Sequence, residues 1–129
     1  MKTKLNVLLI ILVLIISTLL FAQSTSMDVN QFEAKLKEVG SNSQLIDVRT
    51  ADEFSKDHIK GAINYDIYDA NFETNISKLD KSKPVFVYCY SGGRSSQAAN
   101  TMKKKGFKII YDMSEGFVKW KASGKAVTK

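Results

Sequence analysis

The sequence predicts an α/β fold in which a parallel sheet carries helices on both faces. Short runs of apolar, β-branched and aromatic residues, which are typical of buried strands, occur at 44–48, 84–88 and 108–111. Segments with apolar residues three or four positions apart, the spacing of a helix, stand between these runs. Strands that alternate with helices form a parallel sheet joined by crossovers. At 129 residues the chain has room for one such domain.

The N-terminus has the organisation of a secretory signal peptide. Lys2 and Lys4 precede an apolar run from 5 to 21, which Ala22 follows. We therefore expect residues 1–22 to be a signal peptide, and residues 23–129 to be a periplasmic or secreted domain. The alternative is an uncleaved segment that spans a thinned bilayer and anchors the domain outside the cytoplasm. Membrane contact is expected only in that case.

The mature chain begins with a polar stretch, 23–27, which we expect to be a disordered lead-in. Asp28 or Asn30 then caps a helix that Gly40 ends. The core face of that helix is spaced four and then three residues apart, at Phe32, Leu36 and Val39. After the strand at 44–48, Thr50 caps a short helix.

The second half of the chain continues the alternation of strands and helices. A turn and short strand are expected at 61–64, and a docked helix within 65–83. The helical spacing in that segment is carried by Phe72, Ile76 and Leu79. A helix from Ser95 to Lys105 then precedes the strand at 108–111.

The only cysteine lies in the segment Cys89-Tyr90-Ser91-Gly92-Gly93-Arg94-Ser95, between a buried strand and a helix. A glycine-rich turn that opens a helix directs several backbone N–H groups into one concavity, at the positive end of the helix dipole. Such a site stabilises a thiolate and holds an oxyanion beside the sulfur. The alternative, a buried structural cysteine, is disfavoured by the glycines and Arg94.

The pattern Cys-x-x-Gly-x-Arg-Ser at a strand–loop–helix junction resembles the active-site loop of rhodanese (sulfurtransferase) domains. Three further segments resemble that family in the same order, and together they cover residues 28–122. These segments are Leu45-Ile46-Asp47-Val48-Arg49 with Glu53-Phe54, His58 to Asn64, and Gly106-Phe107 through Trp120. The resemblance implies a five-stranded parallel rhodanese-like sheet.

The resemblance also implies a two-step reaction through a persulfide on Cys89, with Arg94 holding the oxygens of the departing group. The substrate-binding residues are expected in the same loop: Tyr90, Ser91, Gly92, Gly93 and Ser95. The donor would be a small anion such as thiosulfate and the acceptor cyanide or a thiol. No cofactor or metal is implied, and we expect a monomer.

Two upstream segments are expected to support the site. Asp47 and Arg49 end a buried strand at the edge where open α/β sheets place their sites. An Arg49–Glu53 ion pair on one helical turn would be structural, and the alternative is that Arg49 holds an anion. The resemblance makes His58, the only histidine, mainly structural; the alternative is a general base to Cys89.

The closing segment departs from the family at one position. The family ends in Gly-Gly-x-x-x-Trp, and here Glu115 replaces the first glycine, ahead of Gly116 and Trp120. We expect the Glu115 side chain near the mouth of the pocket, where it would narrow the pocket or repel anions.

Composition and loop length decide between classes of function. Without Lys2 and Lys4 the formal charge falls from +6 to +4, a mild surplus that suits small anionic substrates. The short lysine run 103–105 ends a helix, so no nucleic acid is expected. Cysteine phosphatases use Cys-x5-Arg, whereas Cys89 and Arg94 are separated by four residues. The tighter loop favours sulfur transfer over a phosphatase or arsenate-reducing enzyme. A non-catalytic rhodanese-like module that binds a partner or senses sulfur is the other alternative.

Overall fold

Five parallel strands form the central sheet, in the order β1-β5-β4-β2-β3. The computed structural model describes residues 1–18 and 22–129. The strands are β1 (Gln23–Met27), β2 (Gln44–Asp47), β3 (Ile63–Asn64), β4 (Val85–Tyr88) and β5 (Ile109–Met113). The helices are α1 (Lys2–Thr18), α2 (Val29–Val39), the 3-10 turn η1 (Gly40–Asn42), α3 (Ala51–Lys56), α4 (Phe72–Ile76), α5 (Gly93–Lys104) and α6 (Gly116–Ala122). The predicted five-stranded parallel sheet is confirmed.

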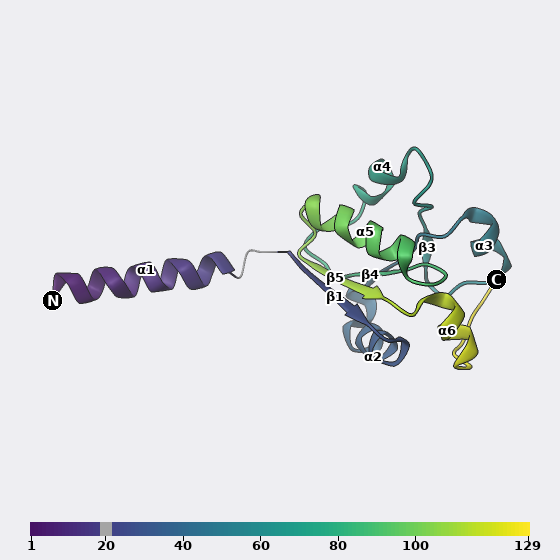
Figure 1. The fold of residues 1–129 in the computed structure, drawn as a ribbon, viewed down its shortest axis with the longest axis horizontal. Helices are drawn as coiled ribbons and strands as arrows, with labels where there is room; N and C mark the ends of the chain where they lie inside the picture. The colour runs from purple at the N-terminus through teal and green to yellow at the C-terminus, as the bar shows by residue number, and fades with distance from the viewer. Residues whose placement is uncertain (19–21) are drawn as a thin grey trace.

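Helices cover both faces of this sheet, as predicted (Figure 1). On one face α4 and α5 pack through Phe72, Ile76, Ala98, Ala99 and Met102. On the other face α2 and α6 pack through Val29, Phe32, Phe117 and Trp120. Each large apolar side chain that becomes fully buried contributes about 1.5–3 kcal/mol of hydrophobic stabilisation. The two clusters fix the strands relative to one another, so the carboxyl ends of the strands lie together at one edge of the sheet.

The expected disordered lead-in is wrong, because residues 23–27 form β1. This strand pairs with β5 along its whole length, from Gln23 opposite Ile109 to Met27 opposite Met113. All its side chains except Met27 are exposed. The strand therefore depends on backbone hydrogen bonds at the edge of the sheet rather than on side-chain burial.

Local capping fixes the starts of the helices that precede the site. Asp28, rather than Asn30, caps α2: its side chain accepts the Gln31 N–H, and the Gln31 side chain accepts the Asp28 N–H. Thr50 caps α3, as predicted, and its hydroxyl accepts from the Glu53 N–H. The helix expected from Ser95 starts two residues earlier, at Gly93.

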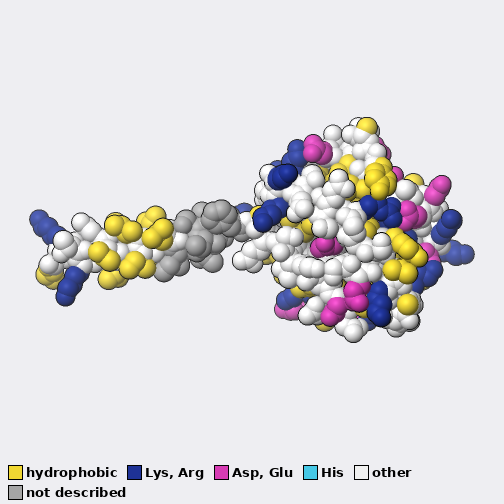
Figure 2. All heavy atoms as spheres, in the orientation of Figure 1, with side chains coloured by type: hydrophobic (Ala, Val, Ile, Leu, Met, Phe, Trp, Pro, Cys, Tyr) yellow, Lys and Arg dark blue, Asp and Glu magenta, His cyan; other side chains and the backbone are white. Residues whose placement is uncertain are grey.

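The N-terminal segment is helical from Lys2 to Thr18. On the face drawn in Figure 2, hydrophobic side chains gather along this helix and basic ones lie at its beginning. Within the described residues no helix combines the length and hydropathy needed to cross a bilayer. Leu20 and Phe21, which precede the predicted cleavage point at Ala22, lie outside the described residues, and the cleavage stays a prediction.

Candidate active site

The candidate site lies at the carboxyl ends of β2 and β4, neighbouring strands in the middle of the sheet. The chain runs from β2 outward to β3 and then returns to β4 on the other side of β2. Open α/β sheets place their binding crevice at such a change in strand order. Asp47 ends β2, and Cys89 directly follows β4, so the topology brings the two predicted segments together.

Cys89 is almost completely buried, with 1% of its surface exposed. Its sulfur accepts a hydrogen bond from the Gly92 N–H at 3.0 Å, and lies 3.6 Å from the Ser95 hydroxyl. Gly92 is the N-cap of α5 and Ser95 lies in its first turn, where the helix dipole places positive potential. The buried strand β4 and the helix start thus fix one sulfur atom in an electropositive position.

Two glycines allow the Cys89 loop and the start of α6 to touch through their backbones. Gly92 has φ 104°, and a Cβ there would overlap the carbonyl oxygen of Ser114. Gly116 has φ 73°, and a Cβ there would overlap the carbonyl of Tyr90. The Val118 N–H donates to the same Tyr90 carbonyl at 3.0 Å. The length and path of the Cys89 loop are therefore set in part by α6.

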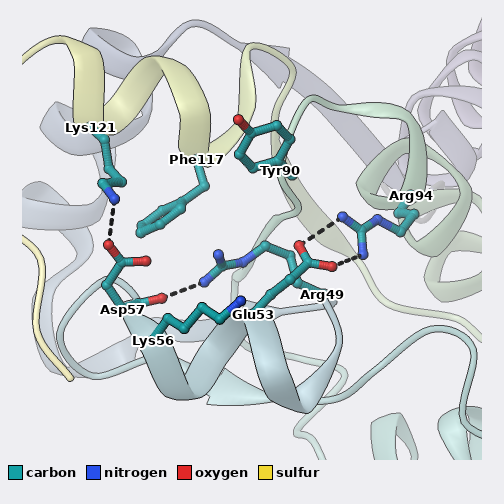
Figure 3. Close-up of a pocket in the computed structure, with 8 residues that line it drawn as sticks. All are labelled: Arg49, Glu53, Lys56, Asp57, Tyr90, Arg94, Phe117 and Lys121. Atoms are coloured by element: carbon teal, nitrogen blue, oxygen red, sulfur yellow. Dashed lines mark hydrogen bonds and ion pairs between the residues drawn. The ribbon is translucent and has the colours of Figure 1, made fainter.

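Arg94 points from α5 toward α3, where it meets Glu53 (Figure 3). Its two terminal nitrogens donate to the two carboxylate oxygens of Glu53 at 2.8 and 3.0 Å. These hydrogen bonds hold the pKa of Glu53 below its ordinary value and raise the pKa of Arg94. A guanidinium group has five N–H donors, so the pair engages two of them and leaves the rest for a ligand. The expected Arg49–Glu53 ion pair is wrong, because Arg94 occupies that carboxylate.

Arg49 instead pairs with Asp47, and both side chains are buried. The Arg49 Nε and Nη2 atoms donate to the Asp47 carboxylate, the latter at 2.7 Å. Nη2 also donates to the Asp57 carbonyl, and the guanidinium lies 4.1 Å from the Phe117 ring centroid. Burial opposes the charge on Arg49, but the hydrogen bonds and the negative charge of Asp47, together with nearby Tyr88 and Glu53, raise its pKa overall. The pair joins β2, α3 and α6 beneath the site.

A hollow of about 430 Å³ opens beside the Cys89 loop. Four cations, two carboxylates and two aromatic rings line it: Arg49, Lys56, Arg94, Lys121, Glu53, Asp57, Tyr90 and Phe117 (Figure 3). Lys121 pairs with Asp57. The cations outnumber the carboxylates, so the hollow favours an anionic ligand of small size.

Of the five predicted substrate-binding residues, only Tyr90 is among the residues that line this hollow. Tyr90 lines it with a side chain that is about half exposed. Ser91 and Gly93 are exposed, and Gly92 and Ser95 face the sulfur. The Ser95 hydroxyl also donates to the Gly92 carbonyl at 3.1 Å, so it closes the first turn of α5 while it touches the sulfur.

His58 lies away from the sulfur, against its own segment. Its Nδ1 is 2.8 Å from the Phe54 carbonyl, and its ring stacks on the Phe54 ring at 3.7 Å between centroids. Its backbone pairs with Thr128 in an isolated bridge. This histidine therefore fastens the C-terminal tail to the end of α3.

The expectation that Glu115 narrows the pocket is wrong. Its carboxylate accepts the Val29 N–H at 3.0 Å, at the start of α2. A carboxylate at a helix N-terminus satisfies a free donor and complements the dipole. The family glycine has thus been replaced by a side chain that caps a helix and leaves the hollow open.

Four residues that line the hollow were not predicted from the sequence: Lys56, Asp57, Phe117 and Lys121. Lys56 ends α3, whereas Phe117 and Lys121 belong to α6. Phe117 and Lys121 face the hollow because the backbone contact at Gly116 orients α6. In the sequence, the only indication that Phe117 and Lys121 belong to the site is that they lie close to Gly116.

Comparison with known proteins identifies the family. Residues 28–123 match the family described as Rhodanese-like domain, which is most of the chain. The chain belongs to the rhodanese-like domain family.

Individual relatives agree with this assignment. The chain is 42% identical over 84 residues to the uncharacterized protein YqhL of Bacillus subtilis, and the match covers 65% of each chain, just under two thirds of the relative. It is 38% identical over 78 residues to the thiosulfate sulfurtransferase GlpE of Coxiella burnetii, covering 60% of this chain and 71% of the relative. Among solved structures, the rhodanese-like domain of the Anabaena protein Alr3790 superposes with a TM-score of 0.71 at 26% identity, covering 80% of this chain and 77% of that one.

Proposed function

We propose that the protein is a sulfurtransferase that carries a sulfane sulfur on Cys89 as a persulfide. The observation that carries the proposal is the hydrogen bond from the Gly92 N–H to the Cys89 sulfur at the start of α5. A donor N–H and the positive end of a helix favour the thiolate, which is the nucleophilic form. The relatives named thiosulfate sulfurtransferase support the same chemistry.

The reaction has two steps, and in each step a new bond to the transferred sulfur forms while one sulfur–sulfur bond breaks. The Cys89 thiolate attacks the outer sulfur of thiosulfate, and sulfite leaves with the electron pair of the old bond. The enzyme then holds Cys89–S–S⁻, whose terminal charge the N–H groups of the loop stabilise. In the second step an acceptor thiolate or cyanide attacks that outer sulfur, and Cys89 leaves as the thiolate.

The cations that line the hollow have different roles in binding the donor. Glu53 neutralises part of the charge of Arg94 and fixes its guanidinium plane, so Arg94 offers its remaining N–H donors in one direction. Lys56 and Lys121 add positive charge at the rim, where they attract a dianion such as thiosulfate. Arg49 is already engaged by Asp47 and acts mainly as support.

The test is the intact mass of the protein before and after incubation with thiosulfate. The expected result is a gain of one sulfur atom, which disappears when cyanide is added. Cys89→Ser is the control and should gain nothing. A wild-type protein that gains no sulfur, although iodoacetamide still alkylates Cys89, would refute thiosulfate as the donor.

The burial of Cys89 favours a second candidate, a rhodanese-like module that senses or binds sulfur without passing it on. In that case thiosulfate or a persulfide would load Cys89, but cyanide and small thiols would fail to remove the sulfur. The same mass measurement separates the two functions, because it follows loading and unloading independently.

We also propose that residues 1–22 direct export of the domain at 23–129 to the periplasm or the exterior. Lys2 and Lys4 followed by an apolar helix support this proposal. Mass spectrometry of the N-terminal peptide from the exported fraction should begin at Gln23. Recovery of the intact segment with membranes would favour an anchor, and recovery with the cytosol would refute export.

A further inference from the structure

The C-terminal tail, residues 125–129, runs from the end of α6 to the segment that follows α3 (Figure 1). The match to the rhodanese-like domain family ends at residue 123, so the tail lies beyond the part of the chain that the family accounts for. The sulfur-transfer scheme above gives the tail no role. Its hydrogen bonds nevertheless connect it to residues that line the hollow.

The tail is attached at both of its ends. Near α6, the indole N–H of Trp120 donates to the Ala126 carbonyl at 3.0 Å. Beyond α3, the His58 N–H donates to the Thr128 carbonyl and the Thr128 N–H donates to the His58 carbonyl, both at 2.8 Å. The tail is therefore a strap that joins α6 to the segment after α3.

The residue next to this attachment, Asp57, contacts two cations of the hollow (Figure 3). Its carbonyl accepts a hydrogen bond from Arg49 Nη2 at 2.7 Å. Its carboxylate pairs with the ammonium group of Lys121. All three residues line the hollow. A displacement of the His58 backbone would move Asp57 and disturb both contacts.

The helix α3 forms one wall of the hollow and depends on contacts at its two ends. It has six residues, and none of its side chains is fully buried. A helix this short is marginal in water unless tertiary contacts hold it. Thr50 caps its beginning. At its other end, the Asp57 carbonyl is held by Arg49 and the His58 backbone is held by Thr128. The tail therefore supplies part of the anchorage of α3.

Two side chains of α3 face the position of the donor. Glu53 accepts two hydrogen bonds from Arg94 and so fixes the plane of its guanidinium group. Lys56 adds a positive charge at the rim. If the end of α3 were released, an arriving anion would first have to order this wall. The cost of that ordering would reduce the affinity for the anion.

We propose that the tail preorganises the hollow, and that Thr128 is a positioning residue for the binding of the anionic donor. Thr128 acts through the His58 backbone on Asp57 and on the end of α3. No residue of the tail belongs to either of the two hydrophobic clusters described above. Detachment of the tail should therefore alter the hollow and leave the core intact. The proposal rests on the proposed function only for the identity of the donor.

The test compares Thr128→Pro with Thr128→Val in the full chain. Proline has no backbone N–H to donate to the His58 carbonyl, whereas valine keeps this donor and the β-branched shape of threonine. Sulfite, the leaving group of the proposed reaction, is the probe, and NMR shifts of the backbone amides report its binding. We expect the dissociation constant of sulfite to rise about fivefold or more in Thr128→Pro, within the range of typical coupling between sites. It should stay unchanged in Thr128→Val.

Thermal unfolding separates positioning from folding. Thr128→Pro should lower the unfolding midpoint by about 5 °C or less, the effect of one lost hydrogen bond in a domain of this size. An unchanged affinity for sulfite in Thr128→Pro would overturn the proposal, and so would equal losses in the two variants. If the wild type bound no sulfite, the anion-binding hollow and the proposal would both fail. Sulfite binding without sulfur loading of Cys89 would refute the proposed function alone.

Hydrogen exchange on the wild-type protein tests the same coupling without any variant. Coupling between two sites is reciprocal, so if the tail raises the affinity for sulfite, bound sulfite must stabilise the attached tail. The Thr128 N–H should therefore exchange about fivefold more slowly when the protein is saturated with sulfite. The Gly106 N–H, which donates to the Lys103 carbonyl after α5, is the control and should not change. An unchanged exchange rate at Thr128 would show that the tail and the hollow are independent.

Discussion

Replacing Arg49 by methionine should destabilise the protein strongly. Asp47 is fully buried and Arg49 is 2% exposed, so Arg49→Met leaves a carboxylate in the interior with no cation to compensate it. Removing one partner of a buried ion pair costs about 3–5 kcal/mol. That is a large part of the roughly 5–15 kcal/mol by which a domain is stable. The midpoint of thermal unfolding should fall by about 15 °C or more.

Urea and thermal unfolding followed by circular dichroism measure this loss. The double variant Asp47→Asn/Arg49→Met removes both charges and should recover most of the stability. Arg94→Met is a matched control, because its pair with Glu53 is partly exposed and should contribute about 1 kcal/mol or less. A loss below about 1 kcal/mol in Arg49→Met, with a raised KM for thiosulfate, would refute the structural role and favour anion binding by Arg49.

Three further predictions concern the loop and its supports. Glu115→Gly should cost about 1 kcal/mol of stability in urea unfolding, since it removes the acceptor of the Val29 N–H at the start of α2, and should leave KM for thiosulfate unchanged. A changed KM would place Glu115 at the hollow after all. Gly116→Ala should abolish sulfur loading of Cys89, because its Cβ displaces the Tyr90 carbonyl, and a fully loaded variant would contradict this packing. Because Arg94 lowers the pKa of Glu53, their pair stabilises the fold above about pH 4.3 and is lost as pH falls through the pKa of folded Glu53. Glu53→Gln should therefore flatten the acid side of a stability–pH curve, and an unaltered curve would show that the pair contributes nothing.

The sequence predicted best those parts of the site that are local in the chain. The Cys89 loop was recognisable because a buried strand, two glycines and an amphipathic helix follow one another directly. The partner of Arg94 was not, because Glu53 lies 41 residues away and only the parallel pairing of β2 with β4 brings them together. The spacing of Arg49 and Glu53 on one helical turn suggested a pair, but Arg49 precedes α3 and turns back toward Asp47.

An edge strand and a buried polar residue were also not predictable from the sequence pattern. The side chains of β1 do not alternate between apolar and polar residues. The segment forms a strand because its backbone pairs with the backbone of β5. The strand predicted at 108–111 continues in the structure to Met113, past Asp112. A carboxyl normally argues against a strand interior, so the apolar pattern ended before Asp112.

Gly92 lies against the Ser114 backbone and Gly116 against the Tyr90 backbone. These contacts restrict how the length of the Cys89 loop can change in evolution. An insertion between Cys89 and Arg94 would push the loop into the start of α6, where there is no space even for a Cβ atom. Conversion to the Cys-x5-Arg spacing of phosphatases would therefore require simultaneous rebuilding of two distant segments. A single insertion in this loop would displace the start of α6 as well, so the loop and the helix can change length only together.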